Sequence, residues 1–165
     1  MNESIKLIRA LWEGSGEFEG RTIPQRFNKP KFEPQPIQKK LTIWVAGNSR
    51  AAMRRAVTLG DAWHPNAFSL EVFRAMISEF RMIPGGETKE ICVRIPLDHK
   101  ATKSEYVQHG ERRLILSGNV NENEHTISEF QKLGVSTMIL ATNHNGAVKV
   151  HDQSESLEKF AKHFL

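Results

Sequence analysis

The sequence has little cysteine: Cys92 is the only thiol among 165 residues. An internal disulfide is therefore excluded, and such cysteine usage is typical of a reducing compartment, which predicts a cytoplasmic protein. The apolar neighbours of Cys92, Ile91 and Val93, indicate a core thiol rather than a nucleophile. The seven histidines and the single cysteine show no metal-ligand spacing, so no metal site is predicted.

Long apolar stretches and a strong charge imbalance are absent as well. No apolar run approaches the roughly 18 residues that a membrane-spanning helix requires. The chain begins with the polar residues Asn2, Glu3 and Ser4 and continues directly into a predicted helix, a pattern unlike a signal peptide. Lysine and arginine total 23 against 19 aspartate and glutamate residues, and the basic pairs are scattered rather than gathered in a stripe. We therefore expect neither a membrane nor a nucleic acid as partner.

The most informative stretch surrounds a continuous apolar run at residues 43–46, which favours a parallel strand buried on both faces. Gly47, Asn48 and Ser49 interrupt this strand and can cap a helix. That helix is indicated by apolar residues at helical spacing, namely Ala52, Met53, Ala56 and Val57. Residues 61–64 then begin the next strand, which completes a strand–helix–strand unit.

The rest of the chain alternates between strand and helix patterns. Strands are predicted at residues 42–47, 61–64, 91–97 and 136–141. Further helices are predicted at residues 3–13, 69–82, 103–116, 121–133 and 154–164. Residues 17–40 are rich in proline and are predicted to form an irregular excursion within a single domain of residues 1–165. The pattern predicts an α/β fold, half of a TIM-type barrel, with four parallel strands in sequential order and helices on the outer face.

Four short segments carry a family resemblance. They are Phe18-Glu19-Gly20-Arg21, Pro34-Gln35-Pro36-Ile37-Gln38, Ile43-Trp44-Val45-Ala46-Gly47 with Asn48-Ser49, and Gly60-Asp61-Ala62-Trp63. In this order and spacing they resemble the C-terminal part of the luciferase-like, flavin- or deazaflavin-dependent monooxygenases and oxidoreductases. The sequence departs from the family pattern in two places: Leu41-Thr42 replaces the usual proline pair before the strand, and Ala62 replaces the usual glycine before the tryptophan. Neither departure changes the predicted fold.

The resemblance implies a complete barrel, which needs about 250 residues, whereas this chain has 165. We therefore expect the first four strands to be missing. The isoalloxazine ring in this family rests largely on those strands, so no residue here is assigned a catalytic role. The implied cofactor is FMN or a deazaflavin such as coenzyme F-420, and the chain alone is expected to be inactive. The alternatives are a non-catalytic flavin- or phosphate-binding module and a ligand-free half-barrel that dimerises.

Ligand groups in such barrels lie at the C-terminal ends of the strands. Gly47 allows close backbone approach to a ligand, Asn48 and Ser49 lie at the start of a helix, and Arg50 can neutralise a phosphate. The resemblance places this turn near the phosphate tail of the cofactor, so these four residues are the predicted cofactor-binding site. Without the resemblance, a tight turn followed by an N-cap is the simpler interpretation. Another such loop, residues 142–146, follows the last strand.

Other polar side chains near the strand ends are weaker candidates. Trp63 and His64 are predicted to border a substrate pocket, although a hydrogen-bonded rim position is the more ordinary interpretation of His64. Arg94 lies in mid-strand and must be paired or reach a wet cavity; a structural ion pair is favoured over an anion site. Asp98 and His99 are adjacent in sequence, so their side chains should diverge and form no acid–base dyad.

An open four-stranded parallel sheet leaves one face and two edges without partners. Apolar side chains from residues 43–46, 91–95 and 138–141 are expected on that face. We therefore predict a homodimer, or a complex with a complementary N-terminal half-barrel chain, that covers the face. The alternative is a monomer in which residues 17–40 fold over the face, with Phe18, Phe27 and Phe32 as its apolar contacts.

Overall fold

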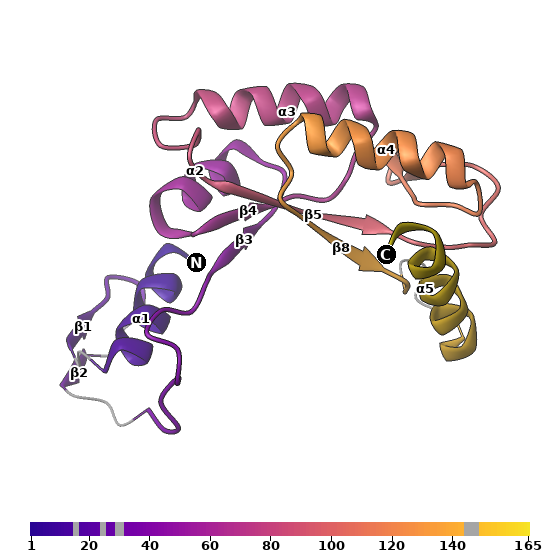
Figure 1. The fold of residues 1–165 in the computed structure, drawn as a ribbon. Helices are drawn as coiled ribbons and strands as arrows, with labels where there is room; N and C mark the ends of the chain where they lie inside the picture. Colours follow the sequence, from indigo (N-terminus) through magenta and orange to yellow (C-terminus); the bar gives the residue numbers. More distant parts are fainter. Residues whose placement is uncertain (15–16, 24–25, 29–31, 144–148) are drawn as a thin grey trace.

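The computed structural model describes residues 1–14, 17–23, 26–28, 32–143 and 149–165. The helices are α1 (Asn2–Glu13), α2 (Arg50–Leu59), α3 (Leu70–Met82), α4 (Val120–Lys132) and α5 (Val150–Phe164) (Figure 1). The strands are β1 (Glu17–Glu19), β2 (Arg26–Asn28), β3 (Trp44–Ala46), β4 (Ala62–His64), β5 (Glu90–Pro96), β6 (Glu105–Gln108), β7 (Glu111–Leu114) and β8 (Thr137–Ala141).

Four of these strands form the central sheet in the order β3-β4-β5-β8. All three pairings are parallel, with Ala46 beside His64, Trp63 beside Ile91, and Arg94 beside Ile139. The strand positions, their parallel pairing and their sequential order confirm the predicted α/β fold. The strands contribute apolar side chains such as Val45, Trp63 and Ile95 to the face of the sheet that the helices cover.

Helices α2, α3 and α4 cover one face of the sheet, and the core lies beneath them (Figure 1). Trp63 stacks on Phe80 of α3 with ring centroids 4.7 Å apart, and Phe73 of α3 meets Phe130 of α4 at 5.0 Å. Met53 of α2 belongs to the same buried cluster. Each fully buried side chain of this size contributes about 1.5–3 kcal/mol of hydrophobic stabilisation. Among the described helices, none combines the length and apolar character needed to cross a bilayer.

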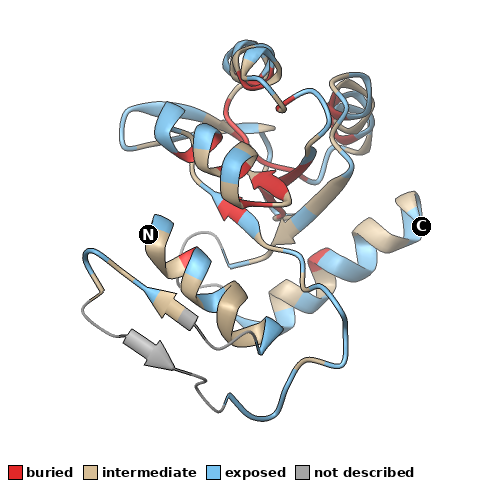
Figure 2. Cartoon of the chain, turned by 90° about the vertical axis from the view of Figure 1, so that its left-hand side faces the viewer, coloured by how far each residue is buried: buried red, intermediate tan, exposed pale blue. Residues whose placement is uncertain are grey.

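Helix α1 lies near the edge strand β3 and helix α5 near the edge strand β8, both away from α3 and α4 (Figures 1 and 2). Ile5 of α1 reaches the core cluster, and Arg9 of α1 forms an ion pair with Asp61, at the start of β4, at 2.7 Å. Asp61 is also bonded to Lys40 at 2.8 Å and to the backbone N–H of Ile43 at 2.9 Å. This carboxylate therefore fastens α1 and the entry to β3 onto β4.

The face of the sheet away from α2, α3 and α4 differs from the predicted apolar surface. Side chains alternate along a strand, so the burial of Val93 and Ile95 in the core places Arg94 on the opposite face. Trp44 and Ile139, each 37% exposed, lie on that same face. We call it the open face, defined by Trp44, His64, Arg94 and Ile139. The expectation that all of residues 91–95 present apolar groups there is wrong, because the two-residue period sends their large apolar members to the helices.

The predicted helix at residues 103–116 is also wrong. These residues form the antiparallel hairpin of β6 and β7, with Tyr106 opposite Arg113. His109 and Gly110 form its turn with φ of 54° and 79°, and two consecutive positive φ values give the twist that a tight hairpin needs. Val107, which contributed to the apparent helical stripe, is 69% exposed. The hairpin joins the domain through a bridge between Phe68 and Arg113.

The proline-rich segment contains a short antiparallel hairpin in which β1 pairs with β2. It lies beside α1, away from β5 and β8 (Figure 1). The Glu3 carboxylate of α1 accepts hydrogen bonds from the backbone N–H groups of Arg21, Thr22 and Ile23, which lower the pKa of Glu3 to about 2. Phe32 is 37% exposed, and the side chain of Phe27 lies outside the described residues.

Candidate functional site

The turn between β3 and α2 has a geometry that only a few residue types accept. Gly47 has φ of 119°, and an added Cβ would lie 3.0 Å from the Cβ of Ala52. The Gly47 N–H donates to the carbonyl of His64 at 3.2 Å, which ties the turn to β4. Ser49 caps α2, since its Oγ accepts a hydrogen bond from the N–H of Ala52 at 3.2 Å. The N–H groups at the start of α2 have no intrahelical partners and form an electropositive end.

Asn48 connects this turn to the loop that follows β4. Its amide nitrogen donates to the carbonyl of Asn66 at 3.0 Å, and its Oδ1 accepts from the N–H of Asn66 at 3.2 Å. Both ends of the side chain are therefore engaged in holding two neighbouring loops together. In the predicted site, the backbone of Asn48 is therefore the part left for contact with a ligand.

Arg50 is committed to a different contact. Its guanidinium forms an ion pair with Glu79 of α3, and this hydrogen bond raises the pKa of Arg50. The pair is exposed, with 75% of the Arg50 side chain accessible, so solvent screens it and it contributes little to stability. A bound phosphate would have to compete with Glu79 for this cation.

Trp63, predicted to border a substrate pocket, lies in the core instead. Its ring is fully buried against Phe80, and its Nε1–H donates to the carbonyl of Gly47 at 2.8 Å. Trp63 therefore supports the candidate turn from below rather than touching a ligand. Side chains alternate between the two faces along a strand. Trp63 therefore points into the core, and its neighbour His64 points to the open face.

His64 is half-buried on the open face. Its Nδ1 contacts the carbonyl of Cys92, and because a carbonyl only accepts, Nδ1 carries a proton in this contact. The ring lies 5.8 Å from that of Trp44, centroid to centroid. Cys92 itself is buried, as predicted, and burial raises the pKa of its thiol.

Arg94 is half-buried on the open face, and its guanidinium forms no ion pair or hydrogen bond with any described residue. The predicted structural ion pair is therefore not found. The backbone of Arg94 holds the neighbouring segment, donating to the carbonyl of Pro65 at 2.9 Å and accepting from the N–H of Ala67 at 3.0 Å. The sheet thus fixes the backbone of Arg94, while its guanidinium has no counterion in the described part of the chain.

The loop after β5 contains Asp98 and His99, which do diverge. Asp98 accepts a hydrogen bond from the N–H of Lys100 at 2.9 Å, whereas Nδ1 of His99 lies 2.8 Å from Oγ of Ser156 on α5. The loop after β8 begins at Thr142, and its residues 144–146 lie outside the described residues. The other ring nitrogen of His99, Nε2, lies 3.4 Å from Oε2 of Glu155 on α5, so the carboxylate partner of this histidine comes from α5 and not from Asp98.

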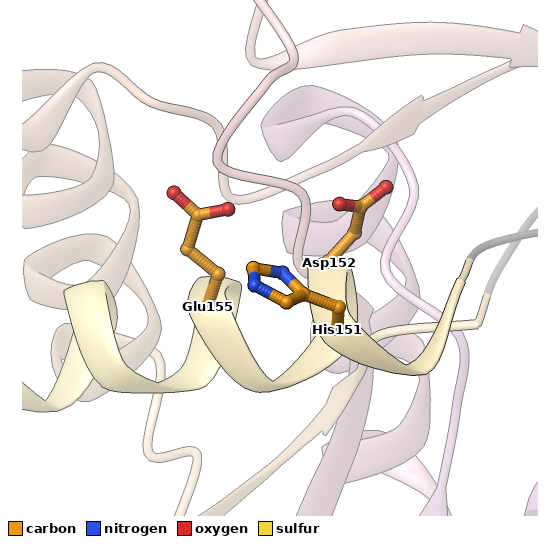
Figure 3. Close-up of side chains that lie close together, drawn as sticks. All are labelled: His151, Asp152 and Glu155. Atoms are coloured by element: carbon orange, nitrogen blue, oxygen red, sulfur yellow. The ribbon is translucent and has the colours of Figure 1, made fainter.

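One group of potential metal ligands occurs in the described part of the chain, and the sequence spacing did not reveal it. His151, Asp152 and Glu155 on α5 have ligand atoms within 4.8 Å of one another (Figure 3). Each carboxylate already has a cation, since Asp152 pairs with Lys100 at 2.8 Å and Glu155 with Lys159 at 2.8 Å. These hydrogen bonds lower the pKa of both carboxyls. The cluster is therefore balanced by lysines and does not require a metal ion.

A hollow of about 680 Å³ adjoins the candidate turn. It is bordered by Asn48, by Ser69, Val72 and Met76 from the start of α3, and by Arg112 of the β6–β7 hairpin. Its volume is in the range of small-molecule pockets, which is about 300–1,000 Å³. Sequence reasoning missed this hollow because the hairpin that forms one wall was predicted to be a helix.

Comparison with known proteins agrees with this architecture. The family described as luciferase-like monooxygenase matches residues 1–145. The chain belongs to this family. A search of curated protein sequences finds no match.

The fold is also found among solved structures. The chain is similar to an F420-dependent secondary alcohol dehydrogenase solved in complex with an F420-acetone adduct, with a TM-score of 0.63 and 14% sequence identity. The match covers 95% of this chain and 58% of that one. This chain therefore spans little more than half the length of the structure that it matches, and the similarity establishes the fold.

Proposed function

We propose that this chain supplies the cofactor-phosphate side of a luciferase-like oxidoreductase that uses a deazaflavin or a flavin. The observation that carries the proposal is the turn of Gly47, Asn48 and Ser49. It lies at the C-terminal end of a parallel strand and at the start of a ten-residue helix. In α/β folds this is the position at which anionic groups bind.

The residues of the turn fit a phosphate. The absence of a Cβ at Gly47 lets the backbone face a ligand closely, and the N-terminus of α2 offers N–H donors with a favourable dipole. The Ser49 hydroxyl accepts from Ala52 and can still donate its own proton to a ligand oxygen. When bound, the cofactor supplies the redox chemistry, and the chain contributes orientation and electrostatics.

Membership of the family supports both flavin and deazaflavin. The F420 dependence of the similar alcohol dehydrogenase favours a deazaflavin such as coenzyme F-420. The hollow beside Asn48, of about 680 Å³, supports this proposal because it offers an adjacent volume for part of such a molecule.

Ser49 offers a substitution that separates helix capping from anion binding. Asp and Asn cap helices about as well as Ser, so S49D and S49N are expected to change the free energy of unfolding by less than about 0.5 kcal/mol. S49D places a negative charge in the turn and should weaken FMN and F420 binding at least about tenfold, whereas S49N should bind like wild type. Fluorescence titration measures all three proteins.

Riboflavin provides the ligand control, because it lacks the phosphate and should be insensitive to S49D. If FMN and F420 bind wild type and S49D equally, the phosphate site lies elsewhere. If neither cofactor binds wild type at concentrations up to about a millimolar, any binding free energy is weaker than about −4 kcal/mol. The chain is then not a cofactor-binding module.

The second expectation concerns catalysis. The isolated chain should show no substrate oxidation with free reduced flavin or F420, because the matched alcohol dehydrogenase is far longer than this chain. Oxygen uptake and deazaflavin absorbance, each measured against a protein-free blank, test this. Turnover above the blank in a preparation free of full-length homologues would refute the requirement for further strands.

A further inference from the structure

The open face carries a charge that the described chain does not balance. Arg94 lies on β5, an inner strand of the sheet, and is half-buried without a counterion among the described residues. Among the side chains that fall outside the described part, Glu17 on β1 is the only acidic one, and β1 lies beside α1, away from β5. A guanidinium that is covered further must find an anion, because desolvating an unpaired charge is strongly unfavourable.

The acidic residue of β5, Glu90, is too far from Arg94 to act as its counterion. Glu90 also points to the open face by the two-residue alternation, but it precedes Arg94 by four residues, a span of about 13 Å along a strand. At the level of Arg94 the neighbouring positions are Ile139 on β8 and Asn66 after β4. Neither is acidic, so the neighbouring strand positions beside Arg94 provide no carboxylate.

The edges of the sheet show how the face can be covered. Among the described strands, β3 and β8 are each paired on one side only, and both run parallel to their neighbours. Further parallel strands that join both edges would close the sheet over the open face and hide Trp44 and Ile139.

A second copy of this chain meets the geometric need but not the electrostatic one. Pairing β3 of one copy with β8 of the other keeps all strands parallel, so the twofold axis runs along the strands. Every residue then meets its symmetry mate at the same level, and Arg94 faces Arg94 across the interior. Two like charges brought together away from water oppose such a dimer.

We propose that the open face binds a complementary half-barrel chain of four parallel strands, which presents a carboxylate to Arg94. This inference rests on the proposed function, because that partner would complete the oxidoreductase of which this chain supplies the cofactor-phosphate side. The Arg94 contact selects the complementary half over a second copy.

A charge exchange at position 94 tests the pairing with this chain alone. In the variant R94E, a second copy acquires the carboxylate that the proposal requires of the partner. Wild type alone and R94E alone should each sediment as the 18.8 kDa monomer at micromolar concentration, because like charges oppose each homodimer. An equimolar mixture should form a heterodimer at least about tenfold more tightly than either homodimer, as read by sedimentation equilibrium and native mass spectrometry.

Arg54 supplies the matched control, since it is exposed on α2, on the helix-covered side of the sheet. Mixing R54E with wild type should give no heterodimer. The neutral variant R94Q provides a second test in case R94E does not fold. Because R94Q removes the repulsion between two Arg94 side chains, its homodimer should be about tenfold or more tighter than that of wild type. Circular dichroism and thermal melting confirm that each variant is folded.

Three results would overturn the proposal. A wild-type homodimer whose affinity R94Q leaves unchanged would identify a second copy as the occupant. A folded R94E that does not pair with wild type, or pairing that R54E reproduces, would remove Arg94 from the interface. Cofactor titration of the Ser49 variants is independent of these results, so failure of the proposed function and failure of the pairing are distinguishable.

Discussion

Replacing Trp63 with alanine is expected to lower the free energy of unfolding by about 3–5 kcal/mol, the cost of removing a large aromatic ring from a packed core. The ring is fully buried and stacked on Phe80 at 4.7 Å, so few neighbouring atoms can collapse into the space. A loss of this size approaches the whole stability of a small domain. Chemical denaturation followed by circular dichroism measures it.

The variant W63F separates packing from hydrogen bonding. Phenylalanine retains most of the buried ring but loses the Nε1–H that donates to the carbonyl of Gly47. We expect W63F to cost about 1–2 kcal/mol, less than half of the loss in W63A. If both variants unfold at the same denaturant concentration as wild type, Trp63 does not organise the core.

The second large effect is expected at Asp61. Asp61 accepts from Arg9, Lys40 and the N–H of Ile43, and D61N should remove about 2–3 kcal/mol of stability because two cations lose their shared anion. The side chain is 20% exposed, so solvent screens these contacts only in part. The equivalent change at Asp98, which accepts one local hydrogen bond, is the control and should cost less than about 1 kcal/mol.

Asp61 also predicts a pH dependence. Burial of Asp61 opposes ionisation, but hydrogen bonds from Lys40, Ile43 and Arg9 outweigh it and hold the pKa of the carboxyl well below its usual range. A depressed pKa contributes stability that is present above the unfolded value of about 3.9 and is lost as pH falls toward the folded value. The stability difference between wild type and D61N should therefore be constant from about pH 7 to 5 and shrink below about pH 4. A difference that grows on acidification would contradict this assignment.

The strands of the central sheet were predictable because their residues satisfy one dominant requirement. Val45, Trp63 and Ile95 must be covered by helices, and continuous apolar runs express that need directly. The turn at Gly47 was predictable as well, since a glycine and a capping serine mark the exit from a strand. What lies around that turn depended on partners distant in the sequence, such as Asn66 for Asn48 and Glu79 for Arg50.

The hairpin of β6 and β7 shows why the rest was not predictable. Residues 103–116 contain few apolar side chains, so a weak helical spacing and a weak alternation are nearly equivalent. The positive φ values at His109 and Gly110 and the bridge between Phe68 and Arg113 favour the hairpin over a helix. The start of α5 at Val150 rather than residue 154 has a similar cause, because the extra turn is polar and gives no periodic signal.

Asn48 forms two hydrogen bonds with the backbone of Asn66, and the amide proton of Asn66 can therefore report whether the candidate turn is closed. The Asn66 N–H donates to Oδ1 of Asn48 and can exchange with deuterium only when that contact opens. Its exchange rate therefore reports the stability of the turn without any label near the cofactor itself. A ligand that closes the turn would slow this single proton, and a ligand that binds elsewhere would leave its rate unchanged.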